Sequence, residues 1–468
     1  MTDKHSRTFT ADTPQKIGET VNLYGWVHAK RNMGQIVFVD LRDGFGRVQV
    51  VFDTQNSFRE QAEGLKPESV VKITGQVVER QGKAINAKIP TGKVEIQATG
   101  LEILNESETP PFEIGQDKAV DEELRLKYRY LDLRHDRIHA NLLMRHQVVN
   151  FIRNFLNERK FTEIETPILT APTPEGARDY MVPSRKYAGS FYALPQSPQQ
   201  YKQLLMVAGF ERYYQIARCM RDEDSRGDRQ PEFTQLDLEM SFVTEEDVLQ
   251  LTEELVTQLV KTLYPDKKLL QQPFPRLTYA EALKKYKSDK PDLRQDKNNP
   301  DELAFAFITD FPLFNKEDGK LNSEHHPFTA PKPDQIKLLD TVPEKVLSTS
   351  YDLVLNGYEI GSGSLRIHEP ALQQKVFEIL GIDAKTAQTK FGHMLEAFKY
   401  GAPPHGGIAP GIDRLMMLLQ NEPNIREVIA FPKTDKGRDP MMGSPIPADT
   451  DTLSELGLQL KQTRNSKP

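Results

Sequence analysis

The sequence predicts an α+β protein in which a small all-β unit precedes a larger unit of mixed helices and strands. Two observations predict this class. Segments with apolar side chains at every second position follow one another between residues 20 and 104, and beyond residue 121 apolar residues at helical spacing alternate with strand patterns. A polar segment with Pro110 and Pro111 separates the two parts. We therefore expect domains at residues 1–104 and 122–468, joined by a linker at 105–121.

Composition excludes several classes of protein. The 468 residues are 38% hydrophobic and 27% charged, as in ordinary globular proteins, and no apolar run approaches the ~20 residues that span a membrane. The single cysteine, Cys219, excludes an internal disulfide framework and a multi-thiolate zinc site. A net charge of −6 argues against a generally basic surface for nucleic acid, although a local basic face is compatible with it. The N-terminus has no signal-peptide or transit-peptide pattern, so we expect a cytoplasmic protein without a membrane partner.

The N-terminal unit has the strand order of an OB-fold barrel. Strands are expected at residues 21–27, 35–41, 47–52, 70–79 and 93–104. A glycine turn at 43–46 and a short helix within 57–63 complete the order. Such barrels commonly bind single-stranded nucleic acid. A small β-sandwich would show similar strands.

The larger unit begins with a long amphipathic helix and a short strand. Apolar residues recur at helical spacing from Leu142 to Leu156, and residues 161–165 then alternate as a strand that Pro167 ends.

A hairpin at residues 213–242 carries the strongest chemical signal. On its second strand Thr234, Leu236, Leu238, Met240 and Phe242 share one face. The other face holds Phe233, Gln235, Asp237, Glu239 and Ser241, as the floor of a ligand site would. A charged loop, 222–231, joins the two strands. Most isolated charged hairpins are solvated surface features, so this pattern alone does not establish a site.

Three further patterns suit a nucleotide site, although each is weak alone. A glycine-rich turn at 406–411 leads into an apolar helix with Arg414 in its first turn, where an anion is favoured. Asp352 and Glu359 could share a magnesium ion with phosphates, since magnesium needs only one or two protein carboxylates. His325 and His326 are adjacent imidazoles, a pair that is more often satisfied or exposed than metal-bound.

Together these segments resemble the class II aminoacyl-tRNA synthetases. Arg221-x-Glu223 through Glu239 resembles motif 2, residues 411–414 resemble motif 3, and 161–167 with the preceding helix resembles motif 1. Residues 173–180, 196–202, 325–329 and 361–366 are similar to the bacterial type of aspartyl-tRNA synthetase. The likeness runs from about residue 17 to 433 and implies a catalytic domain built on an antiparallel sheet flanked by helices. The domain-sized insertion that normally follows a segment like residues 290–294 is expected to be absent.

The resemblance implies a role for each matching residue. Arg221, Glu359 and Arg414 are the expected catalytic residues. ATP would contact Arg221, Glu223, Gln230, Phe233 (stacked on adenine), Glu359, Gly411, Ile412, Asp413 and Arg414. Aspartate would contact Glu175, Gln199, Lys202, Arg221, Asp237, His325 and Arg366. Mg²⁺ would lie on Asp352 and Glu359, and the tRNA anticodon on Arg31, Phe38, Gln49 and Glu95.

The implied activity is that of an aspartate–tRNA ligase, which activates L-aspartate with ATP and transfers it to tRNA(Asp). Positioning and charge neutralisation would carry both steps without a covalent enzyme intermediate. Two alternatives are a tRNA-independent amino-acid ligase on the same core, such as an asparagine synthetase, and a nucleic-acid-binding protein with an inactive catalytic domain. The retained barrel argues against the first, and intact Arg221, Glu359 and Arg414 argue against the second. Relaxed charging of tRNA(Asn) is also open, although Met33, where relaxed members often have histidine, favours tRNA(Asp) alone. The motif 1 helix predicts a homodimer.

Overall fold

The computed structural model describes residues 7–115, 120–172, 177–224 and 226–461. It divides into two compact units, Met1–Lys118 and Ala119–Pro468, which we call unit 1 and unit 2. The division falls within the segment expected to be a linker. The domain limits 1–104, 105–121 and 122–468 stay a prediction. No helix in the described part of the chain is long and apolar enough to cross a membrane.

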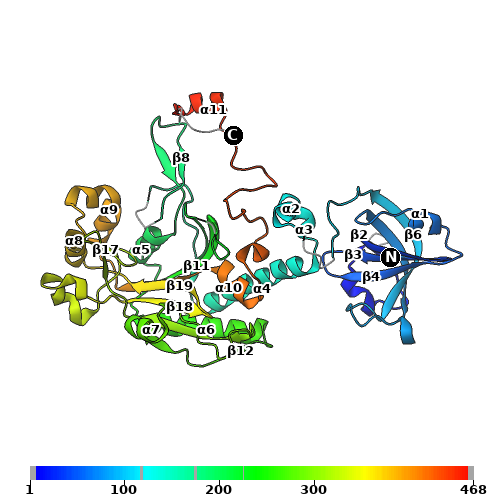
Figure 1. Ribbon diagram of the computed structural model, residues 1–468, viewed down its shortest axis with the longest axis horizontal. Coiled ribbons are helices and arrows are strands. Elements are labelled where there is room, and N and C mark those ends of the chain that lie inside the picture. Colours follow the sequence, from blue (N-terminus) through cyan, green and yellow to red (C-terminus); the bar gives the residue numbers. More distant parts are fainter. Residues whose placement is uncertain (1–6, 116–119, 173–176, 225, 462–468) are drawn as a thin grey trace. The chain divides into compact units, whose positions relative to one another are not determined.

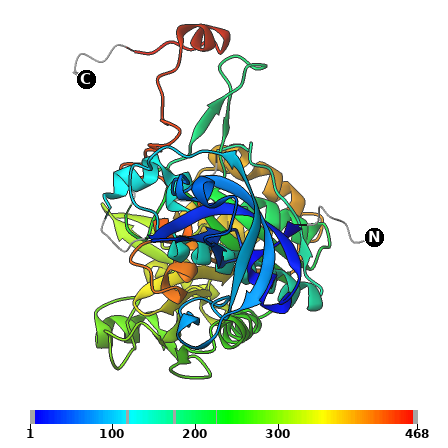
Figure 2. The same cartoon turned by 90° about the vertical axis from the view of Figure 1, so that its right-hand side faces the viewer.

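Unit 1 is an OB-fold barrel, as its strand pattern predicts. Its elements are β1 (Arg7–Thr8), β2 (Thr20–Met33), β3 (Ile36–Arg42), β4 (Arg47–Phe52), α1 (Arg59–Glu63), β5 (Val70–Glu79) and β6 (Val94–Asn105). The sheet order is β1-β2-β3-β4-β6-β5, and β2 also pairs with β5, which closes the sheet. The blue strands curve around this enclosed interior in Figure 2.

Alternation of side chains along the strands builds the barrel interior. Leu23, Val37, Val39, Leu41 and Val50 are fully buried and belong to one apolar cluster. The residues between them face outward, so Asp40 of β3 and its neighbour Gln49 of β4 share the outer face. Arg42, in contrast, is buried in an ion pair with Glu68. β2 is longer than the expected strand because it continues in a hairpin with β3 as far as the Met33–Ile36 pair.

Unit 2 is built on an eight-stranded sheet with the order β13-β15-β18-β19-β20-β11-β10-β7. The strands are β7 (Thr162–Glu163), β10 (Arg212–Met220), β11 (Glu232–Ser241), β13 (Arg276–Thr278), β15 (Phe305–Thr309), β18 (Ser350–Leu355), β19 (Tyr358–Leu365) and β20 (His405–Pro410). The six central strands pair antiparallel, whereas β7 and β13 join the two edges in parallel. The sheet is therefore mostly antiparallel, as expected.

Helices cover one face of this sheet and enclose the main core. α4 (Asp136–Glu158), α6 (Glu245–Leu263) and α10 (Ile412–Leu419) contribute Ile152, Val256 and Met416 to a cluster that includes Leu238 and Leu353 of the sheet. In Figure 1 α6 lies on one side of β18 and β19, and α5 (Gln199–Val207) lies on the other. α5 contacts β11, so the second face of the sheet is covered near its centre.

The predicted faces of β11 are correct except at its end. Leu236, Leu238 and Met240 lie in the core, but Phe242 is 69% exposed. The strand ends at Ser241, and Phe242 has a φ of 59°, a left-handed conformation that turns the chain away from the sheet. The polar face differs from a solvated hairpin, because Asp237 and Glu239 are fully buried.

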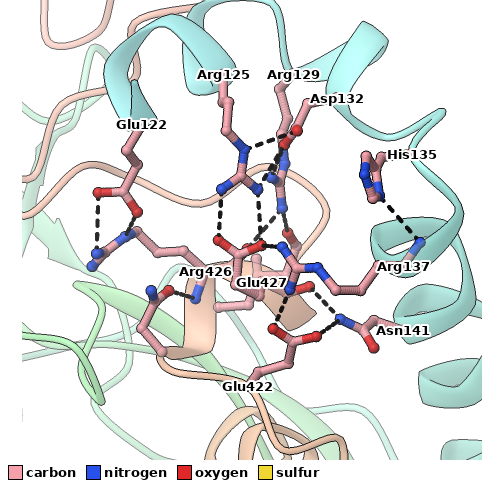
Figure 3. Close-up of polar contacts among 12 residues, drawn as sticks. Glu122, Arg125, Arg129, Asp132, His135, Arg137, Asn141, Glu422, Arg426 and Glu427 are labelled. Carbon is pink, nitrogen blue, oxygen red and sulfur yellow. Dashed lines mark hydrogen bonds and ion pairs between the residues drawn. The ribbon is translucent and has the colours of Figure 1, made fainter. Parts of the chain in front are cut away.

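An ionic network joins the start of unit 2 to the segment after α10 (Figure 3). α2 (Glu122–Lys127) supplies Arg125, which binds Asp132 of α3 (Arg129–Asp132) at 2.9 Å and Glu427 at 2.8 Å. Arg129 is 2% exposed and donates to the carbonyl oxygens of Arg426, Ile429 and Ala430. Residues about 300 positions apart therefore depend on each other for their hydrogen bonds.

The remaining elements are short or peripheral. They are β8 (Met181–Pro183), β9 (Phe191–Ala193), β12 (Lys268–Leu269), β14 (Glu302–Leu303), β16 (Phe314–Glu317), β17 (Lys320–Ser323), α7 (Tyr279–Tyr286), α8 (Pro370–Ile379), α9 (Ala384–Phe398), α11 (Thr450–Glu455) and the 3₁₀ turns Thr10–Gln15, Gly82–Ala84, Pro333–Asp340, Pro343–Lys345 and Ile425–Val428. Residues 287–301, where the insertion domain is expected to be missing, connect α7 to β14 as a loop.

Candidate functional site

A cavity of about 490 Å³ opens on the face of the large sheet that α5 partly covers. It brings together fourteen of the residues expected to form the site: Gln199, Lys202, Arg221, Glu223, Gln230, Phe233, Asp237, His325, Asp352, Glu359, Arg366, Gly411, Asp413 and Arg414. They come from α5, from strands β11, β18 and β19, from the start of α10 and from the loops between these elements. Glu175 lies outside the described residues.

Two cations and a carboxylate line the floor of the cavity, and a second, fully buried carboxylate pairs with both cations. Lys202 Nζ lies 2.6 Å from Asp237 Oδ1 and 3.1 Å from Glu239 Oε2. Arg366 donates to both oxygens of Glu239, at 3.0 and 3.2 Å. All four side chains are at least nine-tenths buried, so each charge depends on the others. We call this group the charge quartet (Lys202, Asp237, Glu239 and Arg366).

The pKa values of the two quartet carboxylates are shifted in opposite directions. Burial alone would raise the pKa of Glu239, but Arg366 and Lys202 outweigh it and lower that pKa to about 2. Burial raises the pKa of Asp237, whose Oδ2 has no hydrogen-bond partner. Asp237 therefore has an acceptor available for a cationic ligand group.

A glycine makes room for the quartet. A Cβ at Gly407 on β20 would lie 2.0 Å from the carbonyl oxygen of Leu238 and 2.3 Å from Glu239 Oε2. Any side chain at this position would displace Glu239 or separate β20 from β11.

The other end of the cavity carries arginines and an aromatic ring. The Arg221 guanidinium lies 5.1 Å from the centroid of the Phe233 ring. Arg414 binds Asp228 at 3.1 Å and the carbonyl oxygen of Glu359, whereas its Nε is buried without a partner. A flat aromatic face and two arginines suit a purine with phosphates.

Two carboxylates and an imidazole meet beside these arginines. Repulsion from Asp352, followed by burial, raises the pKa of Glu359. Asp352 Oδ1 is buried without a hydrogen bond, 3.7 Å from His325 Nε2. Although burial opposes it, the Asp352 carboxylate raises the pKa of His325. Adjacent acids that repel each other fit a shared cation, but no cluster of three or more His, Cys, Asp or Glu side chains suited to a metal occurs among the described residues.

Three residues predicted to contact ATP have side chains that bind or pack against other parts of the protein. The Gln230 amide exchanges hydrogen bonds with the backbone of Lys433. Asp413 accepts from Arg145 and, at 2.8 Å, from the backbone N–H of Thr234. Ile412 is buried in the main core and does not line the cavity. Their side chains position neighbouring segments, so any contact of Ile412 with ATP would use its main chain.

No individual role was expected from the sequence for two residues of this region, Glu239, which pairs with both quartet cations, and His326, which lines the cavity. Glu239 shares a strand face with Asp237, and that spacing of two was the available signal. His326 is half-buried and lines the cavity; burial, then Arg366 and Lys202, lower its pKa to about 3, so the ring is neutral. Its Nδ1 accepts from the backbone N–H of Phe328, and its Nε2 is buried without a partner. The adjacent histidine pair was the signal here.

In unit 1 the four residues expected to read the anticodon lie on one outer surface of the barrel. Arg31 donates to Gln49 Oε1 at 3.2 Å, and Gln49 donates to Glu95 Oε2 at 3.1 Å. Phe38 pairs with Arg31 across β2 and β3 and is half-buried. The surface thus combines one aromatic ring with a row of polar groups.

A second cavity, of about 730 Å³, lies beside the ionic network of Figure 3. Its charged lining includes Arg125, Arg137 and Glu427, which bind one another. The 490 Å³ cavity is therefore the stronger candidate, because several of its buried polar atoms have no partner.

Comparison with known families identifies both units. Residues 121–435 match tRNA synthetases class II (D, K and N), and residues 21–104 match the OB-fold nucleic acid binding domain. An aspartate–tRNA(Asp/Asn) ligase of Rubrobacter xylanophilus is 46% identical over 97% of this chain and 97% of its own length. An aspartate–tRNA ligase of Staphylococcus epidermidis is 40% identical over 96% of this chain and 98% of its own.

The first of these alignments spans 582 positions, more than this chain has residues, so that relative carries residues without a counterpart here. That they form the expected insertion stays a prediction.

Solved structures share the fold. An asparaginyl-tRNA synthetase from Pyrococcus horikoshii, complexed with asparaginyl-adenylate, has a TM-score of 0.74 and 24% identity over 92% of this chain and 98% of its own. An aspartyl-tRNA synthetase from Entamoeba histolytica has a TM-score of 0.71 and 25% identity over 91% of each chain.

The charge quartet yields a stability prediction. Replacing Glu239 with glutamine should lower the free energy of unfolding at pH 7 by about 3–5 kcal/mol, because two buried cations lose a counter-charge. The folded pKa of about 2 lies below the ordinary 4.5, so this stabilisation is complete above pH 4.5 and is lost as the pH falls toward 2. Urea unfolding at pH 7, 5 and 3 should show the difference from wild type narrowing at pH 3.

The matched control is Glu254→Gln, which removes an exposed partner of Arg159 and should cost less than about 1 kcal/mol. A Glu239→Gln difference that is as large at pH 3 as at pH 7 would contradict the assignment.

Proposed function

The chain belongs to the class II tRNA synthetases of the D, K and N group, and from this we propose how its cavity carries out the reaction of an aspartate–tRNA ligase. Relatives that are 40–46% identical over nearly the whole chain are ligases of this kind, and the chain is an aminoacyl-tRNA ligase. A tRNA-independent ligase is not favoured, because the chain has the OB-fold nucleic acid binding domain.

The charge quartet is the observation that carries the choice of aspartate. Lys202 and Arg366 offer two cations at the floor of the cavity, where a side-chain carboxylate can receive charge-assisted hydrogen bonds. Asp237, with its free Oδ2, and Gln199 would face the substrate ammonium, and His325 would make a further substrate contact. A role for Glu175 in this group stays a prediction.

We place ATP at the opposite end of the cavity. Phe233 would stack on adenine, with Arg414 over its other face, and Arg221 would bind the α-phosphate and the substrate carboxylate. Glu223, Gly411 and the backbone around Asp413 complete this end. Asp352 and Glu359 would hold Mg²⁺, which supplies charge neutralisation on the phosphates.

The cavity then serves two steps. The aspartate carboxylate attacks the α-phosphate of ATP, which forms aspartyl-adenylate and releases pyrophosphate. The terminal ribose hydroxyl of tRNA takes the aspartyl group and releases AMP. Arg221 and Arg414 lower the barrier by neutralising charge that develops on the phosphate, and the quartet holds the amino acid in place.

The test is aspartate-dependent exchange between ATP and pyrophosphate, followed by charging of purified tRNA(Asp) and tRNA(Asn). Exchange with aspartate together with charging of tRNA(Asp) is expected. Exchange without charging of either tRNA would instead favour a tRNA-independent ligase. The relatives include ligases named for tRNA(Asp) alone and ligases named for tRNA(Asp/Asn). Whether this chain also charges tRNA(Asn) distinguishes the two specificities. A cytoplasmic location stays a prediction.

Loss of a quartet cation should act on aspartate more than on ATP. Arg366→Leu and Lys202→Met should each lower kcat/KM for aspartate at least about a hundredfold at saturating ATP, since unpairing a buried charge costs about 3–5 kcal/mol. Pyrophosphate exchange on the folded variants measures this. Arg218→Leu, which removes an arginine of an exposed pair with Glu232, is the control and should change little. Near-wild-type kcat/KM in either quartet variant, or comparable activation of asparagine, would refute carboxylate recognition.

The outer surface of the barrel should affect only the second step. Phe38→Ala removes a stacking surface worth about 1–3 kcal/mol per base, so tRNA charging should weaken while pyrophosphate exchange stays near wild type. Phe45→Ala, which removes a more exposed aromatic ring of the same unit, should leave both unchanged. Equal losses of exchange and charging in Phe38→Ala would show that the barrel has a different role.

We also propose a homodimer formed through α4. Leu143 on this helix is 46% exposed, and the projecting β8–β9 hairpin exposes Met181 and Phe191 (Figures 1 and 2). Light scattering at micromolar concentration should give a dimer, and Leu143→Glu should shift it toward monomer. Leu283→Glu, at a comparably exposed apolar residue of α7, should leave the dimer intact. A fully active wild-type monomer would exclude this assembly.

A further inference from the structure

A chain of three hydrogen-bonded side chains lies behind the amino-acid end of the cavity. Gln199 and Gln203 are four residues apart on one face of α5, and both are buried. Gln199 Nε2 donates to Gln203 Oε1 at 3.1 Å, and Gln203 Nε2 contacts His405 Nε2 at 3.2 Å. His405 is 1% exposed, at the start of β20. We call these three residues the amide relay (Gln199, Gln203 and His405).

The direction of the relay is fixed at its buried end. His405 Nδ1 lies 2.7 Å from the carbonyl oxygen of Pro403, which can only accept, so Nδ1 carries the proton. Burial lowers the pKa of His405, so the ring is neutral and its Nε2 is an acceptor. The group of Gln203 that faces this nitrogen must therefore be the NH₂ group.

The tautomer of His405 determines the orientation of both glutamine amides between it and the cavity. Since the NH₂ group of Gln203 faces His405, its Oε1 faces Gln199 and selects the NH₂ group of that residue. The Oε1 of Gln199 is then the polar atom of this residue that has no partner within the relay. Gln199 lines the cavity together with Asp237, so an acceptor faces the place proposed for the substrate ammonium.

We propose that Gln203 and His405 are positioning residues that orient the Gln199 amide so that its oxygen, and not its NH₂ group, meets the ammonium of the substrate. This inference rests on the proposed function, because it assumes that the cavity binds an amino acid. An amide in the opposite orientation would place a donor against the ammonium, losing an attraction and adding a repulsion. The backbone carbonyl of Pro403 thus helps to select a ligand that carries an α-ammonium group.

The test compares aspartate with succinate, which has both carboxylates but lacks the ammonium group. The readouts are KM for aspartate and the inhibition constant of succinate in pyrophosphate exchange by the full chain. Gln203→Met and His405→Phe both remove the orienting contact, and the phenyl ring keeps the packing against Phe398. Each should raise KM for aspartate about tenfold, since a hydrogen bond to a charged group is lost, while succinate inhibits as in wild type.

A conservative variant separates orientation from packing. Gln203→Glu offers only oxygen atoms to Gln199, so it still selects the NH₂ group of that residue and should keep the wild-type ratio of the aspartate and succinate constants. Equal weakening of aspartate and succinate in Gln203→Met and His405→Phe would overturn the proposal, as would a Gln203→Glu variant that resembles Gln203→Met. A wild-type chain without aspartate-dependent exchange would overturn the proposed function and, with it, this inference.

Discussion

The buried pairing of Glu239 with Lys202 and Arg366 is the constraint on which the rest of unit 2 depends. An unpaired charge in this interior would cost several kcal/mol, so three separate elements must meet within hydrogen-bonding distance. β11 must lie beside β20, α5 must lie over β11, and residue 407 must lack a side chain. The same pairs leave two cationic groups beside a cavity, so the feature that stabilises the sheet also provides the chemistry of the site.

Local patterns in the sequence predict much of this arrangement. The alternation in unit 1 predicted strands β2 to β6 of the barrel but not the two-residue β1, and the alternation of β11 separated its core face from its site face. Long motifs in sequence order predicted the class II fold, which the comparisons confirm. The resemblance also named fourteen of the residues that line the cavity, because each of them matches a position in one of its motifs.

What could not be predicted depends on contacts between distant residues. Asp413 lies in a motif expected to bind ATP, yet its carboxylate serves Arg145 and Thr234. Neither partner is marked by spacing, since 268 and 179 positions separate them from Asp413. Likewise the alternation of apolar residues predicted that β11 includes Phe242. The sequence gives no sign of the left-handed backbone at Phe242, which ends the strand at Ser241. Periodicity reports which face a residue occupies, whereas its hydrogen-bond partner is decided by the tertiary structure.

The ionic network of Arg125, Arg129 and Glu427 has a consequence for how the protein is made. Domains fold as units during synthesis, from the N-terminus onward. Unit 1 has all its strands once residue 105 has left the ribosome. Unit 2 is different, because Arg125 and Arg129 emerge about 300 residues before the groups that satisfy them. During most of translation these arginines have Asp132 but lack Glu427 and the carbonyl oxygens of Arg426, Ile429 and Ala430, and the nascent unit 2 cannot close before residue 430 has been synthesised. The barrel is thus a finished module at a stage when the catalytic unit is still an open chain.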